Sequence, residues 1–154
     1  MVVRKIGRLL LFSILVSSAC SSEKEPLFQL VAPEHSNIHF SNRIAENDTF
    51  SILSEEYIYN GGGVGIGDFN NDGLADIYFT GNSVGNALYL NRGDRGSAPL
   101  TFEDITEVAN VAGEDRWCSG VAVVDINQDG WLDIYASATI KKDSTERKNL
   151  LFVN

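Results

Sequence analysis

A loop of alternating oxygen-bearing side chains occurs twice in this 154-residue chain. The first copy begins at Asp68 and the second at Asp125, so the two lie 57 residues apart (125 − 68). Aligned at that offset, residues 63–78 and 120–135 share nine of sixteen positions. A repeat of this length is typical of an array of small supersecondary units, each of which buries an apolar face against its neighbour.

Short apolar segments flank each loop and predict β-strands. "GVGIGD" and "GVAVVD" precede the loops, "ADIYFTG" and "LDIYASA" follow them, and "ALYLN" and "LLFVN" come next along the chain. The second pair is rich in β-branched and aromatic residues, while the first pair is small enough to pack close to other backbone. "TFEDIT" supplies a fourth strand to the first unit only. We therefore predict an all-β fold of about two four-stranded antiparallel units, the second without its last strand.

The region before the repeats, residues 28–60, shows no sustained hydrophobic period. Phe28–Val31 predicts a short strand, and we expect loops with further short strands over residues 32–60. One segment of this region recurs later in the chain. The segment "FQLVAPEHSNI" from Phe28 is similar to "FEDITEVANVAG" from Phe102.

The two loops have the ligand pattern of a calcium site. Counted from its first aspartate, each loop has side-chain oxygens at positions 1, 3, 5 and 9 and a glycine at position 6. Calcium takes about six to eight oxygen ligands, and a glycine at position 6 permits the sharp turn around the ion. Position 7 would contribute its backbone carbonyl, so its side chain can vary. The candidate ligands are Asp68, Asn70, Asp72, Leu74 and Asp76 in the first loop and Asp125, Asn127, Asp129, Trp131 and Asp133 in the second. We predict two calcium ions rather than magnesium, which prefers a strict octahedron and keeps its waters.

Two other interpretations of the loops compete with this one. An EF-hand-type loop closes with an acidic residue at position 12 and continues into a helix. Here position 12 is Phe79 or Ala136, each inside a predicted strand. A simple Asp-Gly hairpin turn needs about two of these residues and no carboxylates at positions 1, 5 and 9 of both copies. A cation loop between two strands is therefore favoured.

At this point the residues resemble a known family. "GVGIGDFNNDGLADIYFTGN" and "GVAVVDINQDGWLDIYASA" resemble FG-GAP/VCBS-type repeats, the blades of integrin-like β-propellers. The "NALYLN…FEDIT" continuation resembles the subgroup that includes the cartilage acidic protein and bacterial ASPIC/UnbV proteins. The resemblance covers residues 60–154, and weakly 28–59. It implies four-stranded blades in which the calcium loop links the first two strands, with blade 1 at residues 61–113 and a truncated blade 2 at 114–154.

A propeller closes with four to eight blades, and this sequence supplies about two. We therefore expect the chain to be a fragment of a longer gene product or a truncated paralogue. Repeat arrays usually need about three or more units to be stable alone.

The N-terminus reads as an export signal. A basic start precedes a short apolar run, Leu9–Val16, and then "SSAC". The run is too short to span a bilayer. Cys20 after small residues resembles a bacterial lipobox, although Ser17 stands where Leu or Val is usual. The resemblance implies cleavage after residue 19, acylation of Cys20 and a tether over residues 20–27, whose "SSEKEP" is similar to the surface-export signal of Bacteroidetes lipoproteins. We expect an outer-membrane, cell-surface lipoprotein of a Gram-negative bacterium.

Charge and cysteine content limit the partners. Without residues 1–19 the chain keeps nine basic and 21 acidic residues, a net charge near −12. This charge opposes binding to nucleic acid, which needs clustered Lys and Arg. If Cys20 is acylated, Cys118 has no partner within the chain, and we expect it to be a small buried thiol.

Two functions remain open. The first is a calcium-stiffened binding or adhesion module whose partner is a protein or glycan at the cell surface. The second is a part of a polysaccharide-degrading enzyme, since some lyases use calcium-bearing propellers. No acid/base or nucleophile constellation stands outside the loops in the sequence, so the first function is favoured and we do not expect an enzyme.

Overall fold

The structure, a computed structural model, describes residues 26–93, 100–113, 116–140 and 143–154. The chain divides into two compact units, Met1–Leu30 and Val31–Asn154, and every helix and strand of the described ranges lies in the second. The predicted signal peptide, Cys20 and most of the tether fall outside the described residues. No helix within those ranges is long and apolar enough to cross a membrane.

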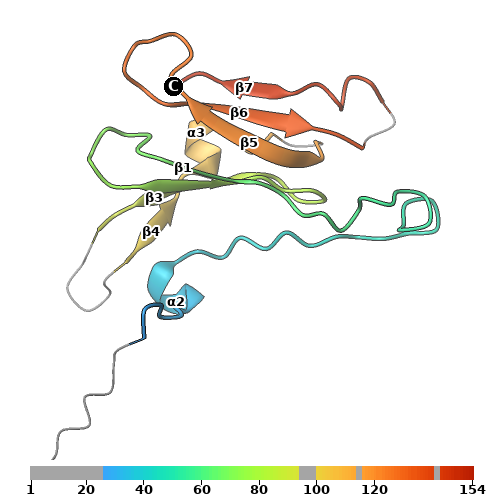
Figure 1. Ribbon diagram of the computed structural model, residues 1–154, viewed down its shortest axis with the longest axis horizontal. Helices are drawn as coiled ribbons and strands as arrows, with labels where there is room; N and C mark the ends of the chain where they lie inside the picture. The colour runs from blue at the N-terminus through green and yellow to red at the C-terminus, as the bar shows by residue number, and fades with distance from the viewer. Residues whose placement is uncertain (1–25, 94–99, 114–115, 141–142) are drawn as a thin grey trace, which may run out of the picture. The chain divides into compact units, whose positions relative to one another are not determined.

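Two antiparallel sheets make up the second unit (Figure 1). The first sheet has the order β1 (Val64–Gly67), β2 (Asp76–Phe79), β3 (Ala87–Asn91) and β4 (Phe102–Asp104). The second sheet has the order β5 (Cys118–Val124), β6 (Asp133–Ala138) and β7 (Leu150–Phe152). Each of the seven predicted repeat strands is present. The all-β prediction is confirmed, and a four-stranded sheet beside a three-stranded one is consistent with incomplete propeller blades.

The strand predictions before the repeats are wrong. Phe28–Val31 belongs to no strand, and residues 32–60 hold only the short helix α2 (Pro33–Ser36) and an isolated bridge between Asn47 and Phe50. The backbone there satisfies its hydrogen bonds locally. The N–H groups of residues 35 and 36 donate to the carbonyl of residue 32, and the N–H groups of residues 49 and 50 donate to the Asn47 side chain. Local bonds of this kind compete with sheet pairing.

The recurring third element is a helical turn. α2 and α3 (Thr106–Ala109) each have four residues and end at an asparagine in the left-handed conformation. The two asparagines, Asn37 and Asn110, have φ values of 60° and 54°. Asparagine tolerates this conformation better than most residues, which explains why the two similar segments stop their helices in the same way.

The strands β1 and β5 lie close together because β1 carries glycine at alternate positions. A Cβ on Gly65 would lie 2.8 Å from a methyl group of Val123, and one on Gly63 would lie 3.0 Å from the Cα of Gly120. The first distance is shorter than real Cβ atoms show, and the second is tighter than most Cβ contacts in proteins. The predicted close backbone packing of "GVGIG" is confirmed.

Strand β3 of the first sheet is buried on both of its faces. On one face Tyr78, Leu88 and Leu90 form a core with Ile134 of β6. On the other face the core consists of Ala87, Tyr89 and Phe102, against which the preceding segment packs through Ile38 and Phe40. The ring of Phe40 stacks on Phe79 with 4.9 Å between centroids. Because successive strand residues point to opposite faces, a strand that is buried on both faces has a continuous apolar sequence, as "ALYL" of β3 does.

Candidate metal-binding loops

The two predicted loops occupy equivalent places in the two sheets. One links β1 to β2 and the other links β5 to β6. Gly67 pairs with Asp76 at the mouth of the first loop, and Val124 pairs with Asp133 at the mouth of the second. Position 9 is therefore the first residue of the following strand. A strand rather than a helix follows each loop, so the EF-hand alternative is excluded.

Within the first loop, the side-chain oxygens of Asp68, Asn70 and Asp72 accept hydrogen bonds from backbone N–H groups of the same loop. The backbone N–H of Asp72 donates to Oδ1 of Asp68 and to Oδ1 of Asn70, both at 3.1 Å. The N–H of Gly73 donates to Oδ2 of Asp68 at 2.8 Å, and that of Leu74 donates to Oδ1 of Asp72 at 2.9 Å. The oxygens at positions 1 and 3 thus converge on one N–H group inside the loop.

The second loop reproduces these four bonds. The N–H of Asp129 donates to Oδ1 of Asp125 at 3.1 Å and to Oδ1 of Asn127 at 3.2 Å. The N–H of Gly130 donates to Oδ2 of Asp125 at 2.9 Å, and the N–H of Trp131 donates to Oδ1 of Asp129 at 2.9 Å. Each bond therefore agrees with its counterpart to within 0.1 Å.

Two residues per loop adopt the left-handed conformation that the turn requires. Position 6 has φ of 86° at Gly73 and 90° at Gly130, as the glycine pattern predicts. Position 4 is also left-handed, with φ of 57° at Asn71 and 61° at Gln128. The left-handed conformation at position 4 was not predicted from the sequence. Of the two position-4 residues, only Asn71 has a residue type that indicates this conformation, because asparagine is enriched among residues with left-handed φ and ψ.

The carboxylate at position 9 has a role that the sequence analysis did not foresee. Asp76 and Asp133 are fully buried, with an exposed fraction of 0%. Oδ2 of Asp76 accepts a hydrogen bond of 2.8 Å from the N–H of Phe69, and Oδ1 accepts one of 2.8 Å from the N–H of Asn91. Asp133 repeats the arrangement with the N–H groups of residues 126 and 154, both at 2.9 Å. Each position-9 aspartate thus ties the start of its loop to the end of the third strand.

Burial opposes ionisation of the position-9 carboxylate in the first loop. It raises the pKa of Asp76 above its ordinary value, and the N–H groups of Asn91 and Phe69 oppose the rise because they stabilise the anion. The negative charges of Asp72 and Asp68 add to the rise. The carboxylates of the loop therefore repel one another, and a cation among them would relieve that repulsion.

The donor set of each loop fits calcium in its chemistry. It consists of side-chain oxygens from three carboxylates and one amide, without nitrogen or sulfur ligands. Among the described residues, no group of three or more His, Cys, Asp or Glu side chains is gathered as a metal site. The side chains of Leu74 and Trp131 at position 7 are 37% and 41% exposed, which agrees with a position whose side chain can vary.

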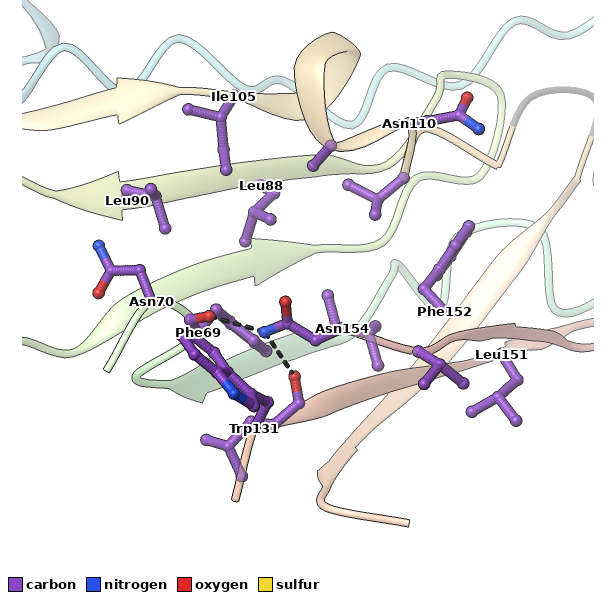
Figure 2. A pocket seen from close by; sticks show the side chains of 15 residues that line it. Phe69, Asn70, Leu88, Leu90, Ile105, Asn110, Trp131, Leu151, Phe152 and Asn154 are labelled. Carbon is purple, nitrogen blue, oxygen red and sulfur yellow. Dashed lines mark hydrogen bonds between the residues drawn. The ribbon is translucent and has the colours of Figure 1, made fainter. Parts of the chain in front are cut away.

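A largely apolar cavity of about 720 Å³ lies beside the loops. Its walls come from Leu88 and Leu90 of β3 and from Ile134 and Phe152 of the second sheet. Figure 2 shows Asn154 at the loop end of this cavity, with its side-chain amide bonded to two backbone carbonyls. No role was predicted for Asn154 from the sequence.

Comparison with known protein families supports the repeat. Residues 68–136 match the model of an FG-GAP-like repeat, a span that runs from position 1 of the first loop into β6. Comparison with curated proteins gives no significant match, and neither does comparison with solved structures. The FG-GAP part of the resemblance is thereby supported.

Proposed function

We propose that this chain is a calcium-binding module of the propeller type, with one ion in each of its two loops. The single observation that carries the proposal is the agreement of the two loops. Eight hydrogen bonds form two matching sets of four, although the loops differ at positions 2, 4, 7 and 8. What stays the same is the set of oxygen-bearing side chains and the glycine. A hairpin turn alone does not require that set.

The residues that would hold the ions are those at positions 1, 3 and 5, with the backbone carbonyl of position 7 and the carboxylate of position 9. A bound calcium ion would supply positive charge and a fixed coordination shell. The protein's own contribution is to gather the oxygens on a loop whose ends are fixed by strand pairing. The role is structural, because the ion would fasten the first strand of each sheet to the second.

The module's proposed task is binding or adhesion to a protein or glycan at the cell surface. Its support is the family match together with the signal-like N-terminus and the acidic composition, which opposes contact with nucleic acid. We propose that Cys20 carries the lipid that holds the protein at the outer membrane of a Gram-negative bacterium. The finer resemblance to ASPIC/UnbV-type lipoproteins motivates this placement.

Titration calorimetry on the detergent-solubilised full-length chain tests the calcium sites. We expect about two ions per chain, one after Asp72→Ala, one after Asp129→Ala and none in the double variant. Asp48→Ala, in an exposed loop before the repeats, is the matched control and keeps both ions. A stoichiometry that the double variant leaves unchanged would rule the sites out.

Acyl labelling in the native host tests the anchor. The wild-type protein should incorporate labelled fatty acid and fractionate with membranes. Cys20→Ala should incorporate none and appear in the soluble fraction, because several acyl chains hold a protein far more firmly than one or none. Cys118→Ala is the control for a thiol elsewhere in the chain. Continued membrane association of the Cys20→Ala protein would contradict the anchor.

A further inference from the structure

We infer that the two loops form one coupled unit, in which occupancy of either loop raises the affinity of the other, and that Asn154 is the positioning residue that joins them. The inference rests on the proposed calcium sites and adds a relationship between them. Its origin is a pair of hydrogen bonds that cross from one repeat to the other.

The first crossing bond belongs to the side chain of Asn154. Its Nδ2 atom donates to the carbonyl of Phe69 at 2.7 Å (Figure 2). Phe69 is position 2 of the first loop, and its N–H donates to Oδ2 of Asp76. On the other side, the N–H of Asn154 donates to Oδ1 of Asp133. A continuous path therefore runs from Asp76 through Phe69 and Asn154 to Asp133, and it joins the position-9 carboxylates of both loops.

The second crossing bond joins the loop backbones directly. Nδ2 of Asn71, at position 4 of the first loop, donates to the carbonyl of Gly130, at position 6 of the second, at 3.3 Å. Both residues have left-handed φ values. The contact thus involves the two backbone segments that must turn most sharply around an ion, so a change in the path of one loop displaces a hydrogen-bond partner of the other.

The bond from Asn154 to Phe69 has no counterpart at Asn91, the equivalent residue of the first repeat. Asn91 occupies the place of Asn154, and its N–H likewise donates to the position-9 aspartate of its own loop. Its Nδ2 donates to the carbonyl of Ala75 at 3.1 Å, within the first repeat. Asn154 has the matching contact with Leu132 at 3.4 Å and adds the bond to Phe69. Asn91 therefore serves as an internal control for Asn154.

The direction of the coupling follows from what ion binding does to a loop. An ion fixes the conformation of the residues around it, and part of that ordering cost falls on groups that the two loops share. Once the first ion has fixed Phe69 or Gly130, the second ion has less left to order, so it binds more tightly. Repulsion between the two ions acts the other way, and salt screens it. Measurements at about 0.5 M KCl, where the Debye length is between about 3 and 8 Å, therefore isolate the contact term.

The chain supplies its own reporter for each loop. Trp131 lies at position 7 of the second loop and is partly exposed, whereas Trp117 is buried. We expect the fluorescence of Trp131 to change when calcium binds to the second loop. Exchanging the two position-7 residues, as Leu74→Trp with Trp131→Leu, moves the reporter to the first loop. Each loop can then be titrated with calcium chloride while the other loop is intact or disabled.

The test compares the calcium affinity of the second loop in the full chain with that in Asp72→Ala, whose first loop is disabled. We expect a loss on the order of fivefold, the lower end of typical coupling between sites. In the Asn154→Ala background the difference should be smaller, because only the bond between Asn71 and Gly130 still crosses, whereas in the Asn91→Ala background the difference should persist in full. Asn71→Gly, which keeps the left-handed backbone and removes the crossing amide, should reduce the difference as well.

The outcomes separate this inference from the function on which it rests. If neither loop binds calcium, both are overturned. If both loops bind but the affinity of the second is the same with Asp72→Ala as without it, the coupling is overturned and the calcium sites stand. If the difference survives both Asn154→Ala and Asn71→Gly, the crossing bonds do not carry it and Asn154 is not the positioning residue. Circular dichroism checks that the Asn154→Ala chain is folded. If it is not folded, the Asn71→Gly variant tests the coupling in its place.

Discussion

The backbone N–H of Asn91 donates a hydrogen bond of 2.8 Å to the buried carboxylate of Asp76. The same relationship recurs between Asn154 and Asp133 at 2.9 Å. In each repeat it fastens the end of the third strand to the end of the loop, fifteen residues away in the first case and 21 in the second. The position-9 aspartate is therefore a structural residue of the sheet in its own right, whether or not an ion is bound.

Replacement of this carboxylate should destabilise the fold even in the presence of a chelator. Asp76→Asn leaves one oxygen for two N–H donors and turns an amide N–H₂ toward one of them. Hydrogen bonds to a charged group contribute about 1.5–3 kcal/mol, so we expect the free energy of unfolding to fall by about 2 kcal/mol. Urea denaturation with excess EDTA measures it, and Asp133→Asn should behave alike.

The control for that change is Asp48→Asn, an isosteric replacement in an exposed loop. Surface substitutions of this kind usually alter stability by less than about 0.5 kcal/mol. Equal effects of Asp48→Asn and Asp76→Asn would show that the buried hydrogen bonds do not matter.

The glycine at position 6 should be replaceable only at a cost in backbone strain. Gly73 and Gly130 have positive φ, yet an added Cβ would meet nothing within 4 Å at either. Alanine therefore fits the space but not the conformation, and the left-handed region costs a side chain about 1–2 kcal/mol. We expect Gly73→Ala and Gly130→Ala each to lower the free energy of unfolding by about that amount.

Gly85→Ala is the matched control for the loop glycines. Its φ lies outside the left-handed region, and its Cβ would make an ordinary 3.7 Å contact with Ala112. This replacement should be neutral or slightly stabilising, because alanine restricts the unfolded chain more than glycine does. A loop glycine that tolerates alanine as well as Gly85 does would contradict the strained turn.

Cys118 should resist modification in the folded protein. Its side chain is fully buried, which confirms the sequence-based expectation of a buried thiol. Burial raises the pKa of the Cys118 thiol, and a hydrogen bond from Asn86 opposes the rise. Since the thiolate is the reactive form, little is available even at pH 8.5. In a Cys20→Ser background, a thiol-specific disulfide reagent should react only after addition of denaturant.

The neighbouring position provides the comparison for Cys118. Ser119 is exposed on the same strand. A Ser119→Cys thiol in a Cys20→Ser, Cys118→Ser background should react rapidly without denaturant. Rapid native labelling of Cys118 itself would mean that β5 opens readily or that the thiol is not buried.

The repeat was readable from the sequence because local chemistry and the global fold agree there. "DIYF" and "DIYA" have the composition of strands, and Asp-Gly with flanking oxygens has that of a tight loop. The glycines of β1 predicted that another strand packs closely against it, and that strand is β5. Each of these signals depends on residues within about ten positions of one another.

The missed features depend on contacts between distant segments. Nothing near Asn154 in the sequence indicates that its amide lies 2.7 Å from the carbonyl of Phe69, 85 residues earlier. Phe28–Val31 has the composition of a strand, but a strand also needs a neighbour, and the described residues offer it none. The bonds of Asp76 to backbone N–H groups were not predicted, because its position in the loop pattern indicated a metal ligand.

Calcium should stabilise the fold, and chelation should lower the melting temperature. Each loop carries three carboxylates. Burial raises the pKa of Asp76, the charges of Asp72 and Asp68 add to that rise, and their repulsion opposes folding when no cation is present. A ligand that binds only the folded state adds RT ln(1 + [L]/Kd), about 2.7 kcal/mol at a hundredfold excess over Kd. Two sites then contribute about 5 kcal/mol, which is comparable to the whole stability of a small domain.

Thermal melts of the full-length chain in millimolar calcium and in excess EDTA measure this contribution. We expect EDTA to lower the melting temperature by many degrees, and magnesium to restore little of it because magnesium tolerates flexible oxygen cages poorly. In Asp72→Ala with Asp129→Ala the melting temperature should no longer depend on calcium, since that variant cannot complete either site. A wild-type melt that is indifferent to the chelator would show that the aspartates only form turns, and the calcium sites would have to be abandoned.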